Sequence, residues 1–481
     1  MSTVVAPTDA PTNPLQDPVV RKVIAAIMVG AMAVVFDSTI LSVAIPTLSK
    51  DLGAPLNTIQ WVVTAYLLAM FAVIPLTGWA QARFGGKRLW LAALSVFTLG
   101  SLLCGFAWSA TSLIAFRALQ GLGGGVIIPL MATIFMQAAR GRAPGRLMAV
   151  VGLPMALGPI LGPVIGGVVL HFAHWSWLFW INFPLGVVGF VMAMRMIPSD
   201  PPTGRPRLDG WGAVLATSGV VALIYGLSNV ARDGGFAHAN VVVPGLAGLA
   251  LVACFIAYSL RRGDDALIDL ALFRHRPLAT STLLAFLAGM ALYGAMLLLP
   301  LFYQQLRGAD VLATGLLLIP QGVGTLASRG FAGRLTDQIG ARAVVIGGFA
   351  IMTAATLPFV FADTGTSAWW LGALLFARGF GTGAVFMPLM AAAYVGLAHD
   401  EIPHASILTR VAQQLGGSFG IAIIAVVLQT HVAHATSAAD AAHAFHVTFW
   451  WAVGSALLAL VVAPLLPGKA MVLAAATGEP S

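Results

Sequence analysis

The chain has 481 residues, of which 59% are hydrophobic and only 9% are charged, and its mean hydropathy is +0.92. Soluble domains carry about 25% charged residues, so this composition excludes a soluble enzyme, a secreted module and a disordered chain. The formal net charge of +8 would suit a nucleic-acid binder. The positions of the basic residues, given below, indicate a polytopic membrane protein instead.

Apolar segments long enough to cross a bilayer follow one another along the chain. A membrane-spanning helix needs about 20 mostly apolar residues, whereas a barrel strand would need about 10 residues of alternating polarity. Fourteen segments qualify: residues 22–48, 58–80, 88–107, 112–136, 146–171, 175–197, 211–231, 239–260, 278–305, 311–332, 342–361, 366–394, 403–432 and 444–466. The expected fold class is therefore an all-α polytopic membrane protein with 14 transmembrane helices.

Basic residues gather at one set of span ends. If the N-terminus is cytoplasmic, nineteen of the 25 Lys and Arg residues lie at cytoplasmic ends. The other six comprise three at outer ends and three within spans: Lys50, Arg232 and Arg307, then Arg117, Arg378 and Arg410. This asymmetry follows the positive-inside rule and predicts that both termini are cytoplasmic. Residues 1–20 show no signal-peptide pattern and are expected to form a polar tail.

Two parts of the chain resemble each other. Residues 78–88 resemble 333–342, and 117–131 resemble 377–390. Repeated halves with a central site are common in transporters. We therefore expect two six-helix bundles with pseudo-two-fold symmetry and an inserted helix pair. The expected divisions are an N-terminal tail (1–21), the first bundle (22–197), two linker helices with flanking cytoplasmic loops (198–277), the second bundle (278–467) and a C-terminal tail (468–481).

Asp37 is the one acidic residue inside a predicted span. An unpaired charge there costs roughly 3 kcal/mol or more. Two interpretations stay open: hydrogen bonds to Ser38 or Thr39, or the favoured one, a carboxyl that faces a cavity and binds protons, ions or a cationic substrate. Arg117 lies at a similar depth in another span, so an Asp37–Arg117 pair is one expected arrangement, with Gln120 as another partner for the arginine.

Small residues recur at helical spacing on two spans. Arg117, Gly121, Gly125 and Pro129 share one helix face, where glycine permits close helix packing. The span at 146–171 carries a second pattern, which predicts a specialised seam between helices: Gly158, Pro159, Gly162, Pro163, Gly166 and Gly167. Proline in this pattern would bend the helix, and a merely kinked, tightly packed helix is the alternative.

Other motifs indicate no catalysis or cofactor. Gly416 to Gly420 and Gly379 to Ala384 resemble a nucleophile elbow and a dinucleotide loop, but both lie in apolar spans without a preceding strand. No phosphate-binding loop for ATP is present. His431, His434, His443 and His446 could bind a metal but fit solvated loop histidines better, so no metal site is expected. Cys104 and Cys254, both in apolar runs, are expected to be buried and unpaired.

At these motifs the chain resembles the major facilitator superfamily, specifically its fourteen-span drug:proton antiporter family. The motifs "FDSTILSVAIP", "RALQGLGGG", "GPILGPVIGG", "WSWLFWINFPLG", "LDGWG" and "RVAQQLGGSFG" carry the resemblance over residues 22–466. It implies gating roles for two cytoplasmic loops: Gly78, Arg83, Gly85, Lys87 and Arg88, then Gly333, Asp337, Gly340 and Arg342. Ala82 departs from the family's acidic residue, which leaves Asp337 as the acid of this pair of loops.

The expected function is a secondary active exporter, not an enzyme, that exchanges protons for amphipathic, cationic or neutral organic compounds by alternating access. Asp37 and Arg117 would couple the protons, with the proton gradient as energy source and no cofactor. Twelve side chains are candidates for the substrate cavity through ring faces and amides: Gln60, Trp61, Thr64, Tyr66, Asn182, Tyr293, Tyr303, Gln304, Gln305, Gln321, Gln413 and Gln414.

The expected partners are a small-molecule substrate, protons and lipid, without nucleic acid or ATP. We expect a monomer in a bacterial cytoplasmic membrane. The alternatives are a dedicated exporter of one metabolite or antibiotic, an importer of the same superfamily, and a membrane-embedded enzyme, for which no cluster of polar catalytic groups is visible in the spans.

Overall fold

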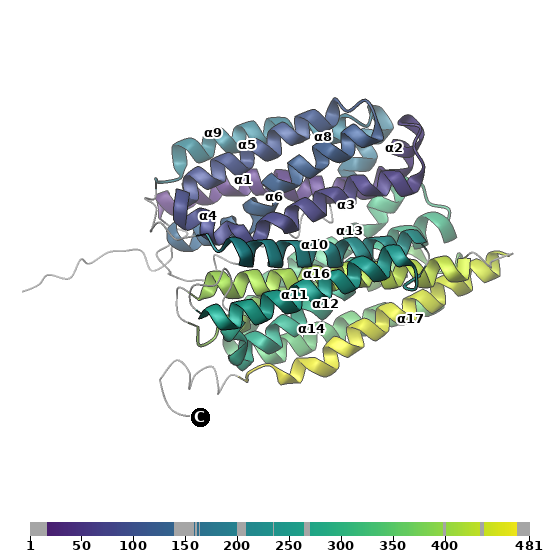
Figure 1. The fold of residues 1–481 in the computed structure, drawn as a ribbon. Helices are drawn as coiled ribbons and strands as arrows, with labels where there is room; N and C mark the ends of the chain where they lie inside the picture. The colour runs from purple at the N-terminus through teal and green to yellow at the C-terminus, as the bar shows by residue number, and fades with distance from the viewer. Residues whose placement is uncertain are drawn as a thin grey trace, which may run out of the picture.

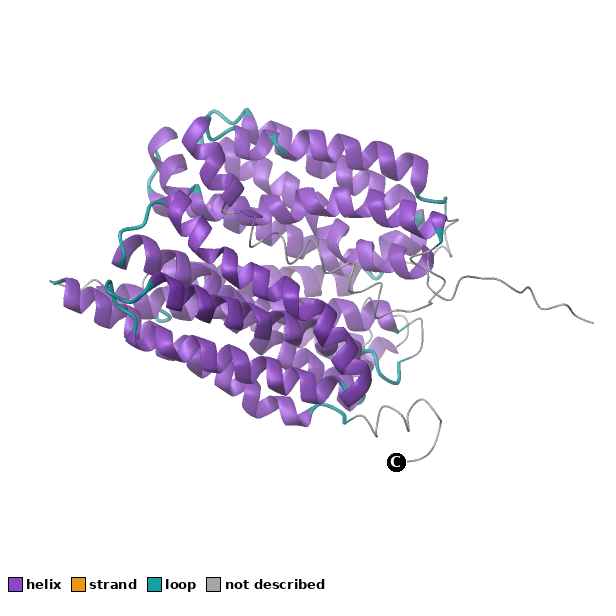
Figure 2. Ribbon diagram, turned by 180° about the vertical axis from the view of Figure 1, so that it is seen from behind, coloured by secondary structure: helices purple, strands orange, loops and turns teal. Residues whose placement is uncertain are grey.

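The computed structural model describes residues 17–138, 158, 161–162, 164–199, 208–233, 235–263, 270–397, 401–432 and 437–468. In these residues every regular element is a helix (Figure 2). The first group of α-helices is α1 (Pro18–Ile40), α2 (Ile45–Asp51), α3 (Leu56–Val73), α4 (Thr77–Phe84), α5 (Gly86–Gly105), α6 (Ala110–Ala138), α8 (Trp177–Trp180) and α9 (Asn182–Met196). The rest are α10 (Gly210–Asp233), α11 (Ala239–Arg262), α12 (Arg276–Leu301), α13 (Val311–Ile339), α14 (Ala341–Thr356), α15 (Ala368–Ala393), α16 (Ile402–Val432) and α17 (Ala438–Val462).

The predicted all-α polytopic membrane fold is confirmed. Within the described residues, 12 helical segments are long and apolar enough to cross a membrane. The segment predicted at 146–171 lies mostly outside the described residues. The segment at 311–332 lies in the 29-residue helix α13, which is not among the 12. The count of fourteen spans therefore stays a prediction.

Two predicted loops are mostly helical. Helix α4 fills residues 77–84 and α13 continues to Ile339, so the loops at 78–88 and 333–342 shrink to tight turns at Gly85 and Gly340. Both glycines adopt positive φ, 82° and 92°, a conformation that side chains with a Cβ rarely adopt. The prediction placed the helix ends too early because hydropathy marks where the bilayer ends, while the helix continues beyond it.

The helices form two groups that follow chain order (Figure 1). Helices α1 to α9 lie together in one group, α12 to α17 lie in the other, and α10 lies along their boundary. Helix α10 packs against α3 on one side and α16 on the other. The Thr217 hydroxyl of α10 donates to the Ala72 carbonyl at 3.0 Å, and Ile224 shares a hydrophobic cluster with Phe71 and Ile407. The predicted domain divisions, including α10 and α11 as linker helices, remain predictions.

Glycines let neighbouring helices approach closely in the same way in both groups. A Cβ on Gly121 of α6 would meet the Tyr66 carbonyl of α3, and a Cβ on Gly379 of α15 would meet the Gln321 carbonyl of α13. Helices in a bilayer associate largely through such backbone approaches. The equivalent contacts indicate that α6 on α3 and α15 on α13 are repeated units.

Gly416 of α16 offers a direct test of this packing, because a Cβ there would meet the Phe286 carbonyl of α12. We expect Gly416→Val to destabilise the protein by about 1–3 kcal/mol, the usual cost of overpacking. The measurement is thermal unfolding in detergent. The control is Gly454→Val in α17, where no atom lies within 4 Å of an added Cβ. Equal unfolding temperatures for the two variants would contradict the packing argument.

Candidate functional site

Asp37 lies near the end of α1 and is 2% exposed. Side chains from two other helices hold its carboxylate. Arg117 Nη1 donates to Oδ2 at 2.5 Å, Gln120 Nε2 donates to Oδ1 at 2.8 Å, and Asn182 Nδ2 donates to Oδ1 at 2.9 Å. The expected Asp37–Arg117 pair is therefore present. All three contacts come from donors, an arrangement that suits an ionised carboxylate.

Arg117, 1% exposed, is fixed on every side. Its Nε donates to the Val62 carbonyl at 3.1 Å and its Nη1 also donates to Gln120 Oε1 at 2.7 Å. The Tyr66 ring lies 4.0 Å from the guanidinium carbon, a cation–π distance. A buried ion pair keeps its charges only when further hydrogen bonds satisfy both partners, and these contacts meet that condition.

Asn182, predicted to line the substrate cavity, belongs to this network, and its role in the cavity stays a prediction. The same Nδ2 that contacts Asp37 lies 3.2 Å from the Ser101 hydroxyl, which donates to the Phe179 carbonyl at 2.9 Å. Cys104 contacts Gln120 Oε1 at 3.6 Å. Sequence reasoning missed Ser101 and Cys104, although their spacing of three along one span was a signal that they share a face.

The ion pair depends on one close helix contact. A Cβ on Gly100 of α5 would lie 2.7 Å from the Gln120 Cα of α6. Only glycine lets α5 and α6 approach at the depth where Gln120 meets Asp37.

The second group contains a similar arginine without an acid. Arg378 of α15 is 3% exposed and donates to Gln321 Oε1 at 3.1 Å and to the Ala291 carbonyl at 3.0 Å. Its Nε has no partner. Gln321, predicted to line the cavity, is thus a neutral acceptor for a buried cation.

The other candidate cavity residues are spread over several places. The ring centroids of Trp61 and Tyr225 of α10 lie 5.4 Å apart, with the rings tilted by 44°. Gln413 Oε1 accepts a hydrogen bond from Arg410 at 3.0 Å. Three of them lie in the π-helical turn Phe302–Leu306, which follows α12: Tyr303, Gln304 and Gln305. Thr64, Tyr293 and Gln414 are half-buried within α3, α12 and α16. The side chain of Gln60 lies outside the described residues.

The predicted seam contacts α1. A Cβ on Gly162 would meet the Thr39 side chain, and one on Gly158 would meet Val35. The Thr39 hydroxyl also donates to the Gly158 carbonyl at 3.0 Å, and Thr39 lies two residues after Asp37 in α1. Gly166 likewise faces Val43, while Gly167 approaches Leu312 of the other group. Pro159 and Pro163 lie outside the described residues.

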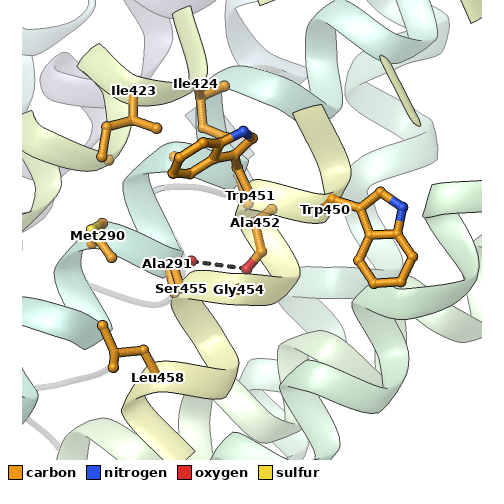
Figure 3. A pocket seen from close by; sticks show the side chains of 13 residues that line it. Met290, Ala291, Ile423, Ile424, Trp450, Trp451, Ala452, Gly454, Ser455 and Leu458 are labelled. Carbon is orange, nitrogen blue, oxygen red and sulfur yellow. Dashed lines mark hydrogen bonds between the residues drawn. The ribbon is translucent and has the colours of Figure 1, made fainter. Parts of the chain in front are cut away.

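A cavity of about 340 Å³ lies elsewhere, between α12, α16 and α17 (Figure 3). Met290, Ile424 and Leu458 contribute apolar walls, and the hydroxyl of Ser455 donates to its own helix at the Ala452 carbonyl. None of the predicted cavity residues lines it. Trp451, also on its wall, is 54% exposed, so this groove faces the surface that lipid would cover.

The predicted gating loops surround Gly85 and Gly340. Arg83, Arg88 and Arg342 are exposed and Lys87 is half-buried. An added Cβ at Gly78 or Gly333 would meet no atom within 4 Å. The side chain of Asp337 lies outside the described residues, so the predicted latch stays a prediction.

Two smaller expectations need correction. His443 and His446 lie in α17 and His431 in α16 rather than in a loop, while His434 lies outside the described residues. In the part of the chain that the structure describes, no group of three His, Cys, Asp or Glu could hold a metal ion. Both cysteines are free, but only Cys104 is buried; Cys254 is exposed, because its helix face is turned away from the bundle.

Comparison with known proteins settles the family. The family model described as Major Facilitator Superfamily matches residues 27–421. The chain belongs to this superfamily of transporters. The "Multidrug resistance protein B homolog" of Mycobacterium tuberculosis is 36% identical over 408 residues, 84% of this chain and 75% of the relative. The "Multidrug export protein EmrB" of Escherichia coli is 32% identical over 397 residues, 81% and 76% of the two chains.

A solved structure supports the fold alone. The human organic anion transporter MFSD10 (TETRAN) has a TM-score of 0.61 at 17% sequence identity, covering 93% of this chain and 100% of its own.

The resemblance to drug transporters of the superfamily is confirmed by the sequence relatives. The protein is a multi-pass membrane transporter of small molecules.

The buried ion pair makes a prediction about stability. Arg117→Met should cost about 3–5 kcal/mol, because it leaves the Asp37 charge buried without its cation. Adding Asp37→Asn to Arg117→Met should restore much of that loss, since the remaining groups are neutral. Thermal unfolding of both single variants and the double variant in detergent measures the coupling. A double variant no more stable than Arg117→Met would contradict the pairing.

Proposed function

We propose that this protein is a proton-driven exporter of amphipathic organic compounds. The observation that carries the proposal is the buried Asp37 carboxylate, paired with Arg117 and tied to Gln120 and Asn182. Ionisable groups within a membrane span are costly and usually functional. The multidrug relatives support an exporter whose substrates include drugs, antiseptics or toxic metabolites.

Asp37 can serve as a proton switch because its hydrogen bonds require its charge. Protonation removes the attraction to Arg117 and replaces one acceptor position with a donor. The contacts that join α1 to α6 and α9 then weaken together. Proton uptake from one side and release to the other would therefore alternate the packing of α1 between two states. One carboxyl gives one proton per cycle.

The seam provides the surface along which α1 would move. Gly158 and Gly162 present backbone rather than side chains to Val35 and Thr39, so small displacements meet few bulky groups. Alternating access would then move the halves around a central substrate site. We place both termini in the cytoplasm and the protein in a bacterial cytoplasmic membrane, because the basic residues follow the positive-inside rule.

Two alternatives lead to different measurements. A dedicated exporter would protect an efflux-deficient host against one compound in a chemically varied panel, whereas a multidrug exporter would protect against several. An importer would move protons in the same direction as the substrate. In proteoliposomes, the sign of the pH change on substrate addition separates importer from exporter.

Asp37→Asn should abolish uphill efflux, because the amide keeps the shape of the side chain but cannot release a proton. Asp37→Glu should retain part of the activity. The measurement is substrate accumulation in inside-out vesicles under an imposed pH gradient. Asp51→Asn, at the exposed end of α2, is the matched control and should transport like the parent. Full uphill transport by Asp37→Asn would place the coupling elsewhere.

Gly162→Leu should block transport while the protein still inserts in the membrane, since the added side chain would collide with Thr39. Gly347→Leu in α14 is its control, because no atom lies within 4 Å of a Cβ there. Efflux and membrane content are measured for both variants. Normal efflux by a well-expressed Gly162→Leu variant would show that α1 does not move along this seam.

A further inference from the structure

The two groups of helices carry different charge in their interiors. In the first group the buried Arg117 is matched by Asp37 at 2.5 Å. In the second group Arg378 is almost as deeply buried, at 3% exposure, but contacts only an amide oxygen and a backbone carbonyl. Burying a charge without a counter-ion costs free energy. The presence of Arg378 at this place therefore suggests that it has a function.

Within the described residues, the helices around Arg378 bring no carboxylate to it. Helices α12, α15 and α16 contain no Asp or Glu at all. The one acid of α13, Asp337, is 16 residues beyond Gln321, or about 24 Å along the helix axis. The guanidinium therefore keeps its charge in surroundings that supply only neutral acceptors.

Arg378 lies near the middle of its helix. It is the eleventh of the 26 residues of α15, close to mid-helix, and its guanidinium lies where α12, α13 and α15 meet. It immediately precedes Gly379, which lies in close contact with the backbone of α13, as Gly121 does with the backbone of α3. Arg378 thus occupies the place that Gln120 occupies beside Asp37 in the first group. Transporters with repeated halves bind substrate near the midplane between those halves.

A second cation lies on the neighbouring helix. Arg410, within α16, is half-buried and donates to Gln413 Oε1 at 3.0 Å. The Gln413 carbonyl in turn lies against Gly289 of α12, two residues before Ala291, the acceptor of Arg378. Arg410 therefore lies on a helix that packs closely against α12.

We propose that Arg378 binds the carboxylate of an amphipathic organic anion, so that the preferred substrates are anionic rather than cationic. The proposal rests on the transport function but not on proton coupling. A guanidinium can hold a carboxylate through two parallel hydrogen bonds, and the unpartnered Nε of Arg378 is one available donor. The apolar part of the molecule would lie among the surrounding helices, and the opening between the halves that transport requires would admit it.

The same charges oppose a cationic substrate. Asp37 is buried, and three donors already surround its carboxylate. A cation would have to displace Arg117, which has its own contacts to Val62 and Tyr66. The proposal therefore favours anions over the cationic or neutral compounds expected from the sequence.

The test compares three probes with one apolar body: pyrenebutanoate, the matching pyrenebutylamine and the neutral amide. Binding is measured by fluorescence with the purified full chain in detergent, without any gradient. We expect the parent to bind the butanoate at least about tenfold more tightly than the amine, the scale of one hydrogen bond between charged groups. Arg378→Gln should remove this preference and leave affinity for the amide within about twofold.

Two further variants make the outcome decisive. Arg195→Gln removes an exposed cation at the end of α9 and should bind like the parent. Arg378→Lys keeps the charge and should retain part of the preference, which also covers the case in which Arg378→Gln fails to fold. Binding is measured without a gradient, so a failure of proton coupling leaves this test intact. Tighter binding of the amine by the parent, or an unchanged preference in Arg378→Gln, would overturn the proposal.

Discussion

The buried ion pair between Asp37 and Arg117 constrains how α1, α6 and α9 pack together. A carboxylate that is 2% exposed can stay charged only if donors reach it from several directions. Those donors stand on α6 and α9, so α1 has one acceptable rotation and depth against both. The close approach at Gly100, where α5 meets the Gln120 backbone, serves the same requirement.

The two groups of helices share packing but differ in electrostatics. Glycine brings α6 onto α3 and α15 onto α13 through equivalent backbone contacts, at Gly121 and Gly379. A repeated fold therefore does not require a repeated charge. The first group contains an ion pair whose charges cancel, whereas the second group contains Arg378 without an acid. In the proposed function, this division would let one half respond to protons while the other half meets the substrate.

Sequence alone predicted the parts of this structure that depend on composition. Hydropathy located the helices, and the cost of an intramembrane charge singled out Asp37 and its pairing with Arg117. It could not predict that Asn182 would join them, because a polar residue in a span reads equally as a cavity residue or as a contact between helices. Tyr66 was assigned to the cavity for the same reason, yet its ring lies against the guanidinium of Arg117. Such assignments depend on helix rotation, which a pattern of apolar residues leaves open in helices that are apolar on every side.

The contacts of α1 differ in how much they depend on the charge of Asp37, and in the proposed proton exchange this difference would give the helix its direction of motion. Its contacts with Arg117, Gln120 and Asn182 depend on the carboxylate charge. Its contacts with Gly158 and Gly162 run through Val35 and Thr39 and do not. Protonation of Asp37 therefore loosens α1 on the side of α6 and α9 but leaves the glycine seam in place. A helix released on one side and guided on the other can shift along the guiding side, which is the movement that exchange of a proton for a substrate requires.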